Sequence, residues 1–305
     1  MCTALTLKTT KDEYFLARNF DYLSSSYLQA ILAPRNFSFM NQLTDEKLLM
    51  KYAVLGMTLL HEGELVFVDG INEKGLTCAI LDLPGEAAWN HEIDLGKDNL
   101  LPTDVSFYIL STFSNISEVK EGITRLNIVA PKTHPFAKET QIHWIVADNS
   151  GACVVIEQTR ESFNVYDNEV GVLTNAPTFD QQLLNLKRVN NHEVPGDYSS
   201  PSRFIRTAFL KNHLELADSI ESTIQASFHL LKSVAMLRGV MKQTINEDYE
   251  TRYTACMCMK TKKYYYCTYD NLEIYTIDLN KEDLNQSELI VYPYPNQQFR
   301  IQNQN

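Results

Sequence analysis

The sequence predicts an α+β protein in which two antiparallel sheets lie face to face, with pairs of helices on their outer sides. Two observations predict this arrangement. The expected elements come in the order strands, helices, strands, helices, strands, without the regular strand–helix alternation of a parallel sheet. Short β-branched and aromatic runs bounded by turn residues dominate the chain. Since no repeat or linker interrupts the pattern, residues 1–305 are expected to form one domain.

The strand signals fall into three groups along the chain. The first group is Cys2–Lys8, Glu13–Arg18, Tyr27–Ala33, Leu65–Asp69 and Leu76–Leu83. The second is Ile142–Asp148, Ala152–Gln158, Phe163–Tyr166 and Gly171–Thr174, with a hairpin turn at Asp148–Gly151. The third is Tyr253–Met259, Lys263–Tyr269 and Glu273–Ile277.

Two helix pairs separate these strand groups. The first pair is expected over Pro102–Phe113 and Asn115–Leu126, where Asn115 and Glu118 resemble a capping box. The second pair is expected over Arg203–Leu214 and Ser219–Leu237. In the last helix one apolar face at helical spacing predicts packing on a sheet: Ile220, Ile224, Phe228 and Leu231. The tail 296–305, rich in Gln and Asn, is expected to fray.

Composition excludes several classes of function. Hydrophobic residues make up 44% of the chain and charged residues 21%, which is typical of a globular protein with a large core. The net charge is −11 and the basic residues are spread out, so no nucleic-acid partner is expected. No apolar run approaches the roughly 20 residues that a membrane span needs. Lys8 and Lys11 interrupt any signal peptide, which predicts a cytoplasmic protein with its cysteines as thiols. Neither metal-ligand spacing nor a cofactor motif is present.

Cys2 is the first candidate for catalysis. A small residue after Met1 permits removal of the methionine, which leaves Cys2 with its own free α-amine. An unperturbed thiol has a pKa of about 8.5 and an α-amine a pKa of about 7.7–8.0. The amine can therefore take the thiol proton and later protonate a leaving amine. These properties predict an amide hydrolase with Cys2 as nucleophile.

The second strand brings two charged residues toward Cys2. In a hairpin of Cys2–Lys8 with Glu13–Arg18, opposed residue numbers sum to about 20 or 21, which sets Arg18 or Asn19 across from Cys2. A guanidinium beside the thiol lowers its pKa. Asp21 follows, and its carboxylate can orient the α-ammonium. An ordinary ion pair at a strand end is the alternative interpretation of Arg18 and Asp21.

Several separate motifs resemble the choloylglycine hydrolase family, which holds bile salt hydrolases and penicillin V acylases. The resemblance covers nearly the whole chain in the right order. Its motifs are Met1–Leu7, Ala17–Asp21, Pro34–Arg35, Lys51–Met57, Asp69–Leu76, Gly171–Pro177, Pro195–Tyr198, Pro201–Phe204 and Tyr253–Met257.

The resemblance implies an N-terminal-nucleophile (Ntn) hydrolase fold, a four-layer αββα sandwich that needs no cofactor or metal. It also implies roles for individual residues. Cys2 matches the nucleophile, and Arg18 and Asp21 match the pair around the thiol and amine. Asn175 matches the oxyanion residue, with its amide donating to the tetrahedral intermediate. Arg203 matches the second arginine of the site.

Two positions depart from the family pattern. At Asp82 the bile salt hydrolases have Asn and the penicillin acylases usually Tyr, which favours a role for the backbone N–H over the side chain. Between Leu186 and Pro195 the loop is short, whereas family members often carry a long loop that helps to lock a tetramer. The sequence therefore predicts a dimer. Asp82 and the short loop also motivate a third hypothesis, a non-catalytic homologue acting as a binding protein.

The substrate choice depends on weaker features. Three segments resemble the bile salt hydrolases more than the penicillin acylases: Leu83–Pro84, Glu157–Thr159 and Val234–Gly239. They favour glycine or taurine conjugates of bile acids, with penicillin V or another N-acyl amide as the alternative. The expected apolar pocket residues are Leu23, Tyr27, Leu59, Leu60, Phe67, Ile80 and Phe136, although each of these also fits an ordinary core position.

Overall fold

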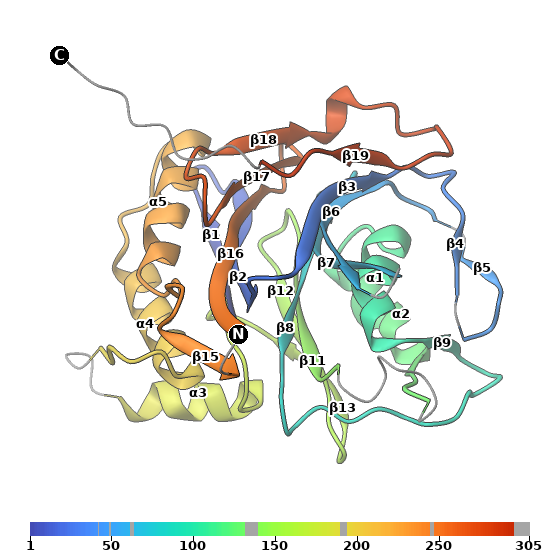
Figure 1. Ribbon diagram of the computed structural model, residues 1–305, viewed down its shortest axis with the longest axis horizontal. Coiled ribbons are helices and arrows are strands. Elements are labelled where there is room, and N and C mark those ends of the chain that lie inside the picture. The colour runs from blue at the N-terminus through green and yellow to red at the C-terminus, as the bar shows by residue number, and fades with distance from the viewer. Residues whose placement is uncertain are drawn as a thin grey trace.

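Two antiparallel sheets packed face to face form the centre of the molecule, with helices on both outer sides (Figure 1). The computed structural model describes residues 1–41, 43–48, 50–61, 64–131, 140–189, 194–244 and 247–295. The layers confirm the predicted αββα sandwich. The expected tail 296–305 lies outside the described residues, and the single domain stays a prediction.

The first sheet carries the N-terminus. Its strand order is β14 (Val172–Leu173), β1 (Cys2–Lys8), β2 (Tyr14–Leu23), β16 (Glu247–Cys258), β17 (Lys263–Thr268) and β18 (Tyr275–Asp278), with β15 (Met241–Thr244) also pairing with β16. All of these pairs are antiparallel. The N-terminal strand therefore lies between a short edge strand and β2.

The second sheet is built from the middle of the chain. Its strand order is β13 (Phe163–Asp167), β12 (Cys153–Gln158), β11 (Ile142–Ala147), β8 (Thr77–Asp82), β7 (Glu64–Asn72), β6 (Val54–His61), β3 (Tyr27–Ala33) and β19 (Ile290–Tyr292). Two small two-stranded sheets lie apart from it, β4 (Phe39–Met40) with β5 (Lys47–Leu48) and β9 (Asp98–Leu100) with β10 (Leu126–Ile128).

The helices divide between the two outer faces (Figure 1). On one side are α1 (Val105–Thr112) and α2 (Ile116–Gly122); on the other are α3 (Phe179–Arg188), α4 (Ser200–His213) and α5 (Ile220–Lys232). Short 3₁₀ turns occur at Pro102–Asp104, Ile123–Arg125 and Leu279–Lys281. α1 contacts β6, β7 and β8, whereas α4 and α5 contact β1, and α5 also contacts β2 and β16.

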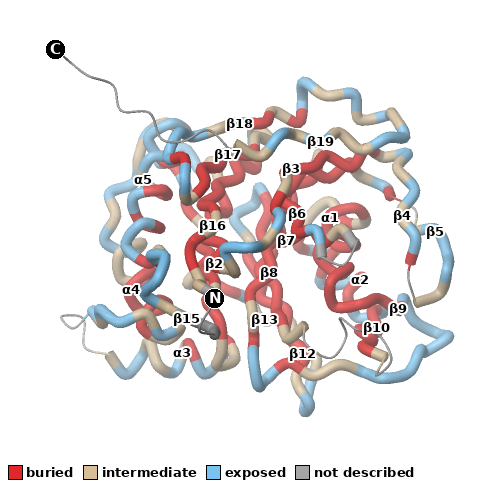
Figure 2. Tube along the Cα trace, in the orientation of Figure 1, coloured by how far each residue is buried: buried red, intermediate tan, exposed pale blue. Residues whose placement is uncertain are grey.

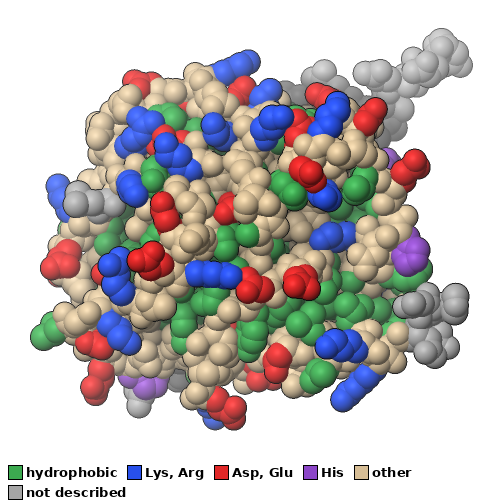
Figure 3. Space-filling view, turned by 180° about the vertical axis from the view of Figure 1, so that it is seen from behind, with side chains coloured by type: hydrophobic (Ala, Val, Ile, Leu, Met, Phe, Trp, Pro, Cys, Tyr) green, Lys and Arg blue, Asp and Glu red, His purple; other side chains and the backbone are tan. Residues whose placement is uncertain are grey.

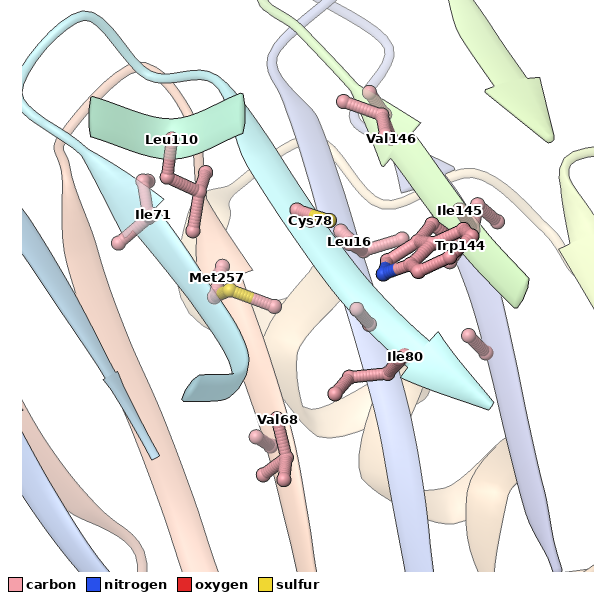
Figure 4. Packing of buried hydrophobic residues seen from close by; sticks show 14 of the residues in the cluster. Leu16, Val68, Ile71, Cys78, Ile80, Leu110, Trp144, Ile145, Val146 and Met257 are labelled. Carbon is pink, nitrogen blue, oxygen red and sulfur yellow. The ribbon is translucent and has the colours of Figure 1, made fainter. Parts of the chain in front are cut away.

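The buried residues lie along the inner strands and on the sheet-facing sides of the helices (Figure 2). Figure 4 shows how the layers meet: Leu16 of β2 and Met257 of β16 belong to the same cluster as Trp144 of β11 and Leu110 of α1. Full burial of a large apolar side chain stabilises a fold by roughly 1.5–3 kcal/mol. The continuous cluster explains why the sheets stay together.

The structure corrects some predicted elements. α3 is missing from the predicted set because Phe179–Arg188 is mostly polar and follows a turn-like segment, although Asp180 in its first turn and Arg188 in its last suit a helix. β6 is also missing, since Val54–His61 shows no polar alternation. The predicted Ser219–Leu237 helix ends earlier, at Lys232. Conversely, the Asn115 cap is confirmed: its side chain accepts the Glu118 N–H at 3.0 Å.

The molecular surface carries charges of both signs. Seen from behind, Lys and Arg side chains are interspersed with Asp and Glu side chains, and apolar side chains lie between them (Figure 3). In the part of the chain that the structure describes, no helix has both the length and the apolar character needed to cross a bilayer.

Candidate active site

The β1–β2 hairpin sets Cys2 and Arg18 on the same face of the first sheet. The observed register pairs Cys2 with Phe20 and Ala4 with Arg18, so opposed numbers sum to 22 instead of the predicted 20 or 21. Arg18 therefore lies diagonal to Cys2. The observed sum of 22 differs from 20 by two residues. Because side chains alternate between the two faces of a strand, a shift of two keeps Arg18 on the face that carries Cys2, whereas Asn19 lies on the opposite face.

The Arg18 guanidinium contacts the thiol directly. Its Nη2 donates to Cys2 Sγ at 2.9 Å, and its Nη1 donates to the Val68 carbonyl of the opposite sheet at 2.8 Å. The Phe20 ring lies 4.9 Å from the guanidinium carbon, within range of a cation–π contact. Arg18 is fully buried, so its charge acts on Cys2 without screening by bulk water.

Asp21 lies beside the chain terminus. Its Oδ1 accepts the Thr251 hydroxyl at 2.5 Å, and its backbone carbonyl accepts the Met1 amine at 2.9 Å. Its Oδ2 is buried without a hydrogen-bond partner among the described residues. Burial raises the pKa of Asp21, while the terminal ammonium and Arg203 lower it. The free oxygen can accept a donor from the terminal amine.

Asn175 and Arg203 close the site from the helical side. Asn175 follows β14, and its Oδ1 accepts the Cys2 backbone N–H at 2.7 Å. Arg203, near the start of α4, donates Nη2 to the same oxygen at 2.8 Å and Nη1 to the Cys2 carbonyl and to Thr3 Oγ1. Since Oδ1 accepts both donors, the Asn175 Nδ2 points away from Arg203 and donates to the Asp82 carbonyl at 2.9 Å.

Asp82 ends β8 at the opposite side of the site. The neighbouring Leu83 donates its N–H to Gln141 beside β11, so the Asp82 backbone groups point to the other edge of the strand. There β7 pairs with β8 only as far as Ala79, short of Asp82. The Asp82 carboxylate, 40% exposed, lies 3.3 Å from the Met1 amine.

The electrostatics of Cys2 combine opposing effects. Burial raises the pKa of the Cys2 thiol, whereas Arg18 and the terminal ammonium lower it, and Asp82 and Asp21 raise it further. Five other cysteines are buried free thiols: Cys78, Cys153, Cys256, Cys258 and Cys267. Burial also raises the pKa of Cys153 and of Cys256 to about 12, so Cys2 is distinguished by the guanidinium that contacts its sulfur directly.

The expected pocket residues separate into two groups. Leu23 is half-buried at the end of β2, two residues beyond Asp21. Leu59 is on the inner face of β6, because Met57, two residues before it, pairs with Asp69, whose carboxylate faces Arg18. Tyr27 and Leu60 oppose each other on the outer face of β3 and β6 and are exposed, at 57% and 44%.

Phe67 and Ile80 do not reach Cys2. Phe67 stacks on Phe107 of α1 at 4.8 Å, on the outer side of the second sheet. Ile80 lies on the same face of β8 as Cys78, which pairs with Gly70 of β7. A Cβ atom added at Gly70 would meet the Leu110 side chain of α1, so this face points toward α1. Both side chains are therefore core between the sheet and α1 and do not belong to the proposed pocket. Phe136 lies outside the described residues.

Four residues near Arg18 were not assigned a role from the sequence. Phe20 lies opposite Cys2, Thr251 binds Asp21, and Val68 and Asp69 contact Arg18. Phe20 and Asp69 belong to the motifs Ala17–Asp21 and Asp69–Leu76, which carried the resemblance but gave neither residue a chemical role. Val68 and Thr251 carried no signal in the sequence, since ordinary strand residues acquire these contacts only through pairing of the sheets.

An αββα sandwich with a cysteine at the start of an inner strand defines the class of N-terminal-nucleophile hydrolases. A sequence model of the linear amide C–N hydrolases, choloylglycine hydrolase family, matches residues 2–292. The chain belongs to this family and is an amide-hydrolysing enzyme.

Individual relatives agree with this assignment. The chain is 37% identical to the bile salt hydrolase/transferase of Clostridium perfringens, covering 96% of this chain and 97% of the relative. The crystal structure of a conjugated bile acid hydrolase from Clostridium perfringens superposes with a TM-score of 0.88 at 35% identity over 100% of both chains. A penicillin V acylase from Agrobacterium tumefaciens shares the fold, with a TM-score of 0.80 at 21% identity over 95% of this chain and 90% of that chain.

Proposed function

We propose that this protein hydrolyses the amide bond of glycine- or taurine-conjugated bile salts, with Cys2 as the nucleophile. The observation that carries the proposal is the convergence on Cys2: Arg18 contacts its sulfur at 2.9 Å while Asn175 holds its nitrogen at 2.7 Å. The relatives matched over nearly their whole length are named bile salt hydrolases, which supports the choice of substrate.

Removal of Met1 activates the site. The Cys2 nitrogen then becomes an amine beside the sulfur, and it keeps Asn175 Oδ1 as an acceptor. The unpartnered Asp21 Oδ2 provides a second acceptor for the ammonium form. The amine takes the thiol proton, and the buried Arg18 stabilises the resulting thiolate.

The thiolate attacks the amide carbonyl and forms a tetrahedral intermediate. Its oxyanion accepts hydrogen bonds from Asn175 Nδ2 and from the Asp82 backbone N–H, which points to the strand edge free of β7. The α-ammonium returns its proton to the leaving nitrogen, the C–N bond breaks, and glycine or taurine departs. A thioester between Cys2 and the bile acid remains.

Water completes the cycle. The neutral α-amine accepts a proton from water as its oxygen attacks the thioester carbonyl. The second tetrahedral intermediate uses the same two donors, the C–S bond breaks, and the bile acid leaves. The proton returns to the thiol–amine pair of Cys2. Arg203 donates hydrogen bonds to the Cys2 carbonyl and to Asn175, and it thereby keeps the nucleophile and the oxyanion donor in fixed relative positions throughout the cycle.

The apolar part of the substrate fits beside the terminal residues. Leu23 and Leu59 supply apolar surface on the Cys2 side, whereas Tyr27 and Leu60, on the outer face of the second sheet, lie outside the proposed pocket. Penicillin V is the second candidate substrate, because its phenoxyacetyl group needs the same apolar surface and the same amide chemistry. The bile salt assignment is favoured by 37% identity to a bile salt hydrolase, compared with 21% to the penicillin V acylase of known structure.

We also propose a cytoplasmic location and a dimer. The buried free thiols suit a reducing compartment. The dimer rests on the short connection between Leu186 and Pro195, of which residues 190–193 lie outside the described part.

Parallel assays of amine release test the function. The protein, with Met1 removal verified by intact mass, is incubated with glycocholate, taurocholate and penicillin V, and Cys2→Ala serves as the matched control. We expect release mainly from the two bile salts and none in the variant. Release mainly from penicillin V would move the substrate to the second candidate. Failure to cleave any of the three would contradict the proposal and favour a binding protein.

A further inference from the structure

Asp69 is a buried carboxylate on the far side of Arg18 from Cys2. It lies in the middle of β7, has no exposed surface, and its Oδ2 lies 3.6 Å from Arg18 Nη1. The two anionic groups, the carboxylate and the thiolate, therefore contact the same guanidinium from different directions. A buried cation between two anions divides its stabilisation between them.

A bulge in β7 builds this arrangement. The pairing with β6 shifts between Met57–Asp69 and Thr58–Phe67, which leaves Val68 as the extra residue. The Val68 carbonyl is consequently free to accept Arg18 Nη1 at 2.8 Å. Arg18 thus extends from the first sheet to two consecutive residues of the second, and this anchor fixes the direction of its Nη2 toward Cys2.

Two tyrosines from the first sheet hold the carboxylate. Tyr264 donates to Oδ1 at 2.7 Å and Tyr253 donates to Oδ2, while the Met57 N–H lies 3.4 Å from Oδ1. Burial, with Asp69 nearby, raises the pKa of both tyrosines well above the usual value, so they keep their protons. Because both carboxylate oxygens accept hydroxyl hydrogens, the arrangement suits the ionised form of Asp69.

The pKa of Asp69 is subject to opposing effects. Burial, the largest of them, raises this pKa above the usual value for an aspartate, and Arg18, the two tyrosines and the Met57 N–H oppose that rise. Two hydroxyl donors and a cation around the carboxylate stabilise its charged form.

We propose that Asp69 is a positioning residue that clamps Arg18 and limits how strongly Arg18 stabilises the Cys2 thiolate. The proposal rests on the proposed role of Cys2 as the nucleophile. It assigns Asp69 two effects. The clamp keeps Nη2 aimed at the sulfur, and the negative charge prevents Arg18 from lowering the thiol pKa so far that the thiolate becomes a weak nucleophile.

The charged and titratable groups around this pair come from several elements. Cys2 faces Arg18 and Asp21 of β2, Arg203 of α4, Asp82 of β8 and the terminal amine. Asp69 faces Arg18 of β2, Tyr253 of β16, Tyr264 of β17 and Cys78 of β8. Among the described residues, Arg18 alone combines a hydrogen bond to the sulfur with an ion pair to Asp69, so a change at Asp69 reaches Cys2 mainly through that residue.

The test measures the Cys2 thiol without any substrate. The processed protein is alkylated with iodoacetamide, and the mass of the N-terminal peptide reports modification of Cys2 without a contribution from other thiols. The alkylation rate is measured as a function of pH, and the pH at which it reaches half of its maximum is the midpoint. In Asp69→Asn the side chain keeps its size and loses its charge, which leaves the thiolate as the remaining anion on Arg18. We expect the midpoint to fall by about one pH unit, or about tenfold faster alkylation below it, with lower kcat.

Two further variants separate this effect from simple loosening of the fold. Asp148→Asn is the matched control: Asp148 is also buried and accepts the N–H groups of Ile116 and Ser150, away from Arg18. We expect its midpoint to stay at the parent value. Tyr264→Phe keeps the charge of Asp69 but removes a donor, so the carboxylate competes harder for Arg18 and the midpoint should rise.

Each outcome bears on the proposal. An unchanged or higher midpoint in Asp69→Asn, or a lower one in Tyr264→Phe, would overturn it. If Asp69→Asn does not fold, Tyr264→Phe alone decides. Alkylation reports on the thiol whatever the substrate is, so absence of bile salt hydrolysis in the parent protein would count against the proposed function and leave this inference intact.

Discussion

Asn175 offers the most direct test of the proposed oxyanion site. Its side chain makes three hydrogen bonds of 2.7 to 2.9 Å, to the Cys2 nitrogen, to Arg203 and to the Asp82 carbonyl. Asn175→Ala removes the Nδ2 donor that the proposal assigns to the intermediate. Loss of one such donor reduces kcat by about 10²–10³-fold, or about 3–4 kcal/mol of transition-state stabilisation.

The same substitution also affects the folded state. It leaves the buried Arg203 Nη2 without its acceptor, and an unsatisfied buried donor costs about 1–3 kcal/mol. The melting temperature should therefore fall as well. The assay measures kcat and KM separately on a conjugated bile salt, with the variant protein verified as folded at the assay temperature.

A matched asparagine separates catalysis from stability. Asn168 is equally buried, donates to the Val172 carbonyl at 3.1 Å and accepts the Gly171 N–H at 2.7 Å, just before the segment that carries Asn175. Asn168→Ala should lower the melting temperature and leave kcat within about threefold of the parent value. If Asn175→Ala also kept kcat within that limit, the assignment of its amide to the oxyanion would be refuted.

Four further predictions use other features of the site and fold. Cys2→Ala, or a preparation that retains Met1, should show no hydrolysis while folding normally; residual turnover would exclude the N-terminal thiol as nucleophile. Asp82→Asn should change kcat by less than about threefold, because its backbone N–H is the proposed donor, whereas a large gain would show that the carboxylate opposes the oxyanion. Burial lowers the pKa of Lys211 from 10.5 to about 8, so the unfolded chain binds the Lys211 proton more tightly than the folded protein does. The free energy of unfolding of the parent protein should therefore rise as the pH increases from about 8 to about 10.5. Lys211→Met should lack this rise, of up to about 3 kcal/mol, in urea titrations at the two ends of the range. Sedimentation equilibrium should give twice the mass of the chain, and a tetramer mass would contradict the predicted dimer.

The sequence by itself determined the class of the fold and the identity of the nucleophile candidate. Alternating and β-branched runs predict strands because successive side chains point to opposite faces, and that signal depends on neighbours along the chain. Cys2 stands out for the same local reason, since its thiol and future amine belong to one residue. The motifs around Arg18, Asp21, Asn175 and Arg203 then identified the family.

Only the tertiary structure decided how these residues meet. The register of β1 and β2 differs from the predicted one, since strand pairing depends on packing across two sheets as well as on the turn. Asn175 reaches Cys2 across 173 residues of chain, and Asp69 reaches Arg18 because a bulge in β7 faces the opposite sheet. Phe67 and Ile80 have apolar patterns suited to a pocket, yet they face α1. Local patterns give each residue an element and a face, whereas the partner across the sandwich depends on how distant segments pack.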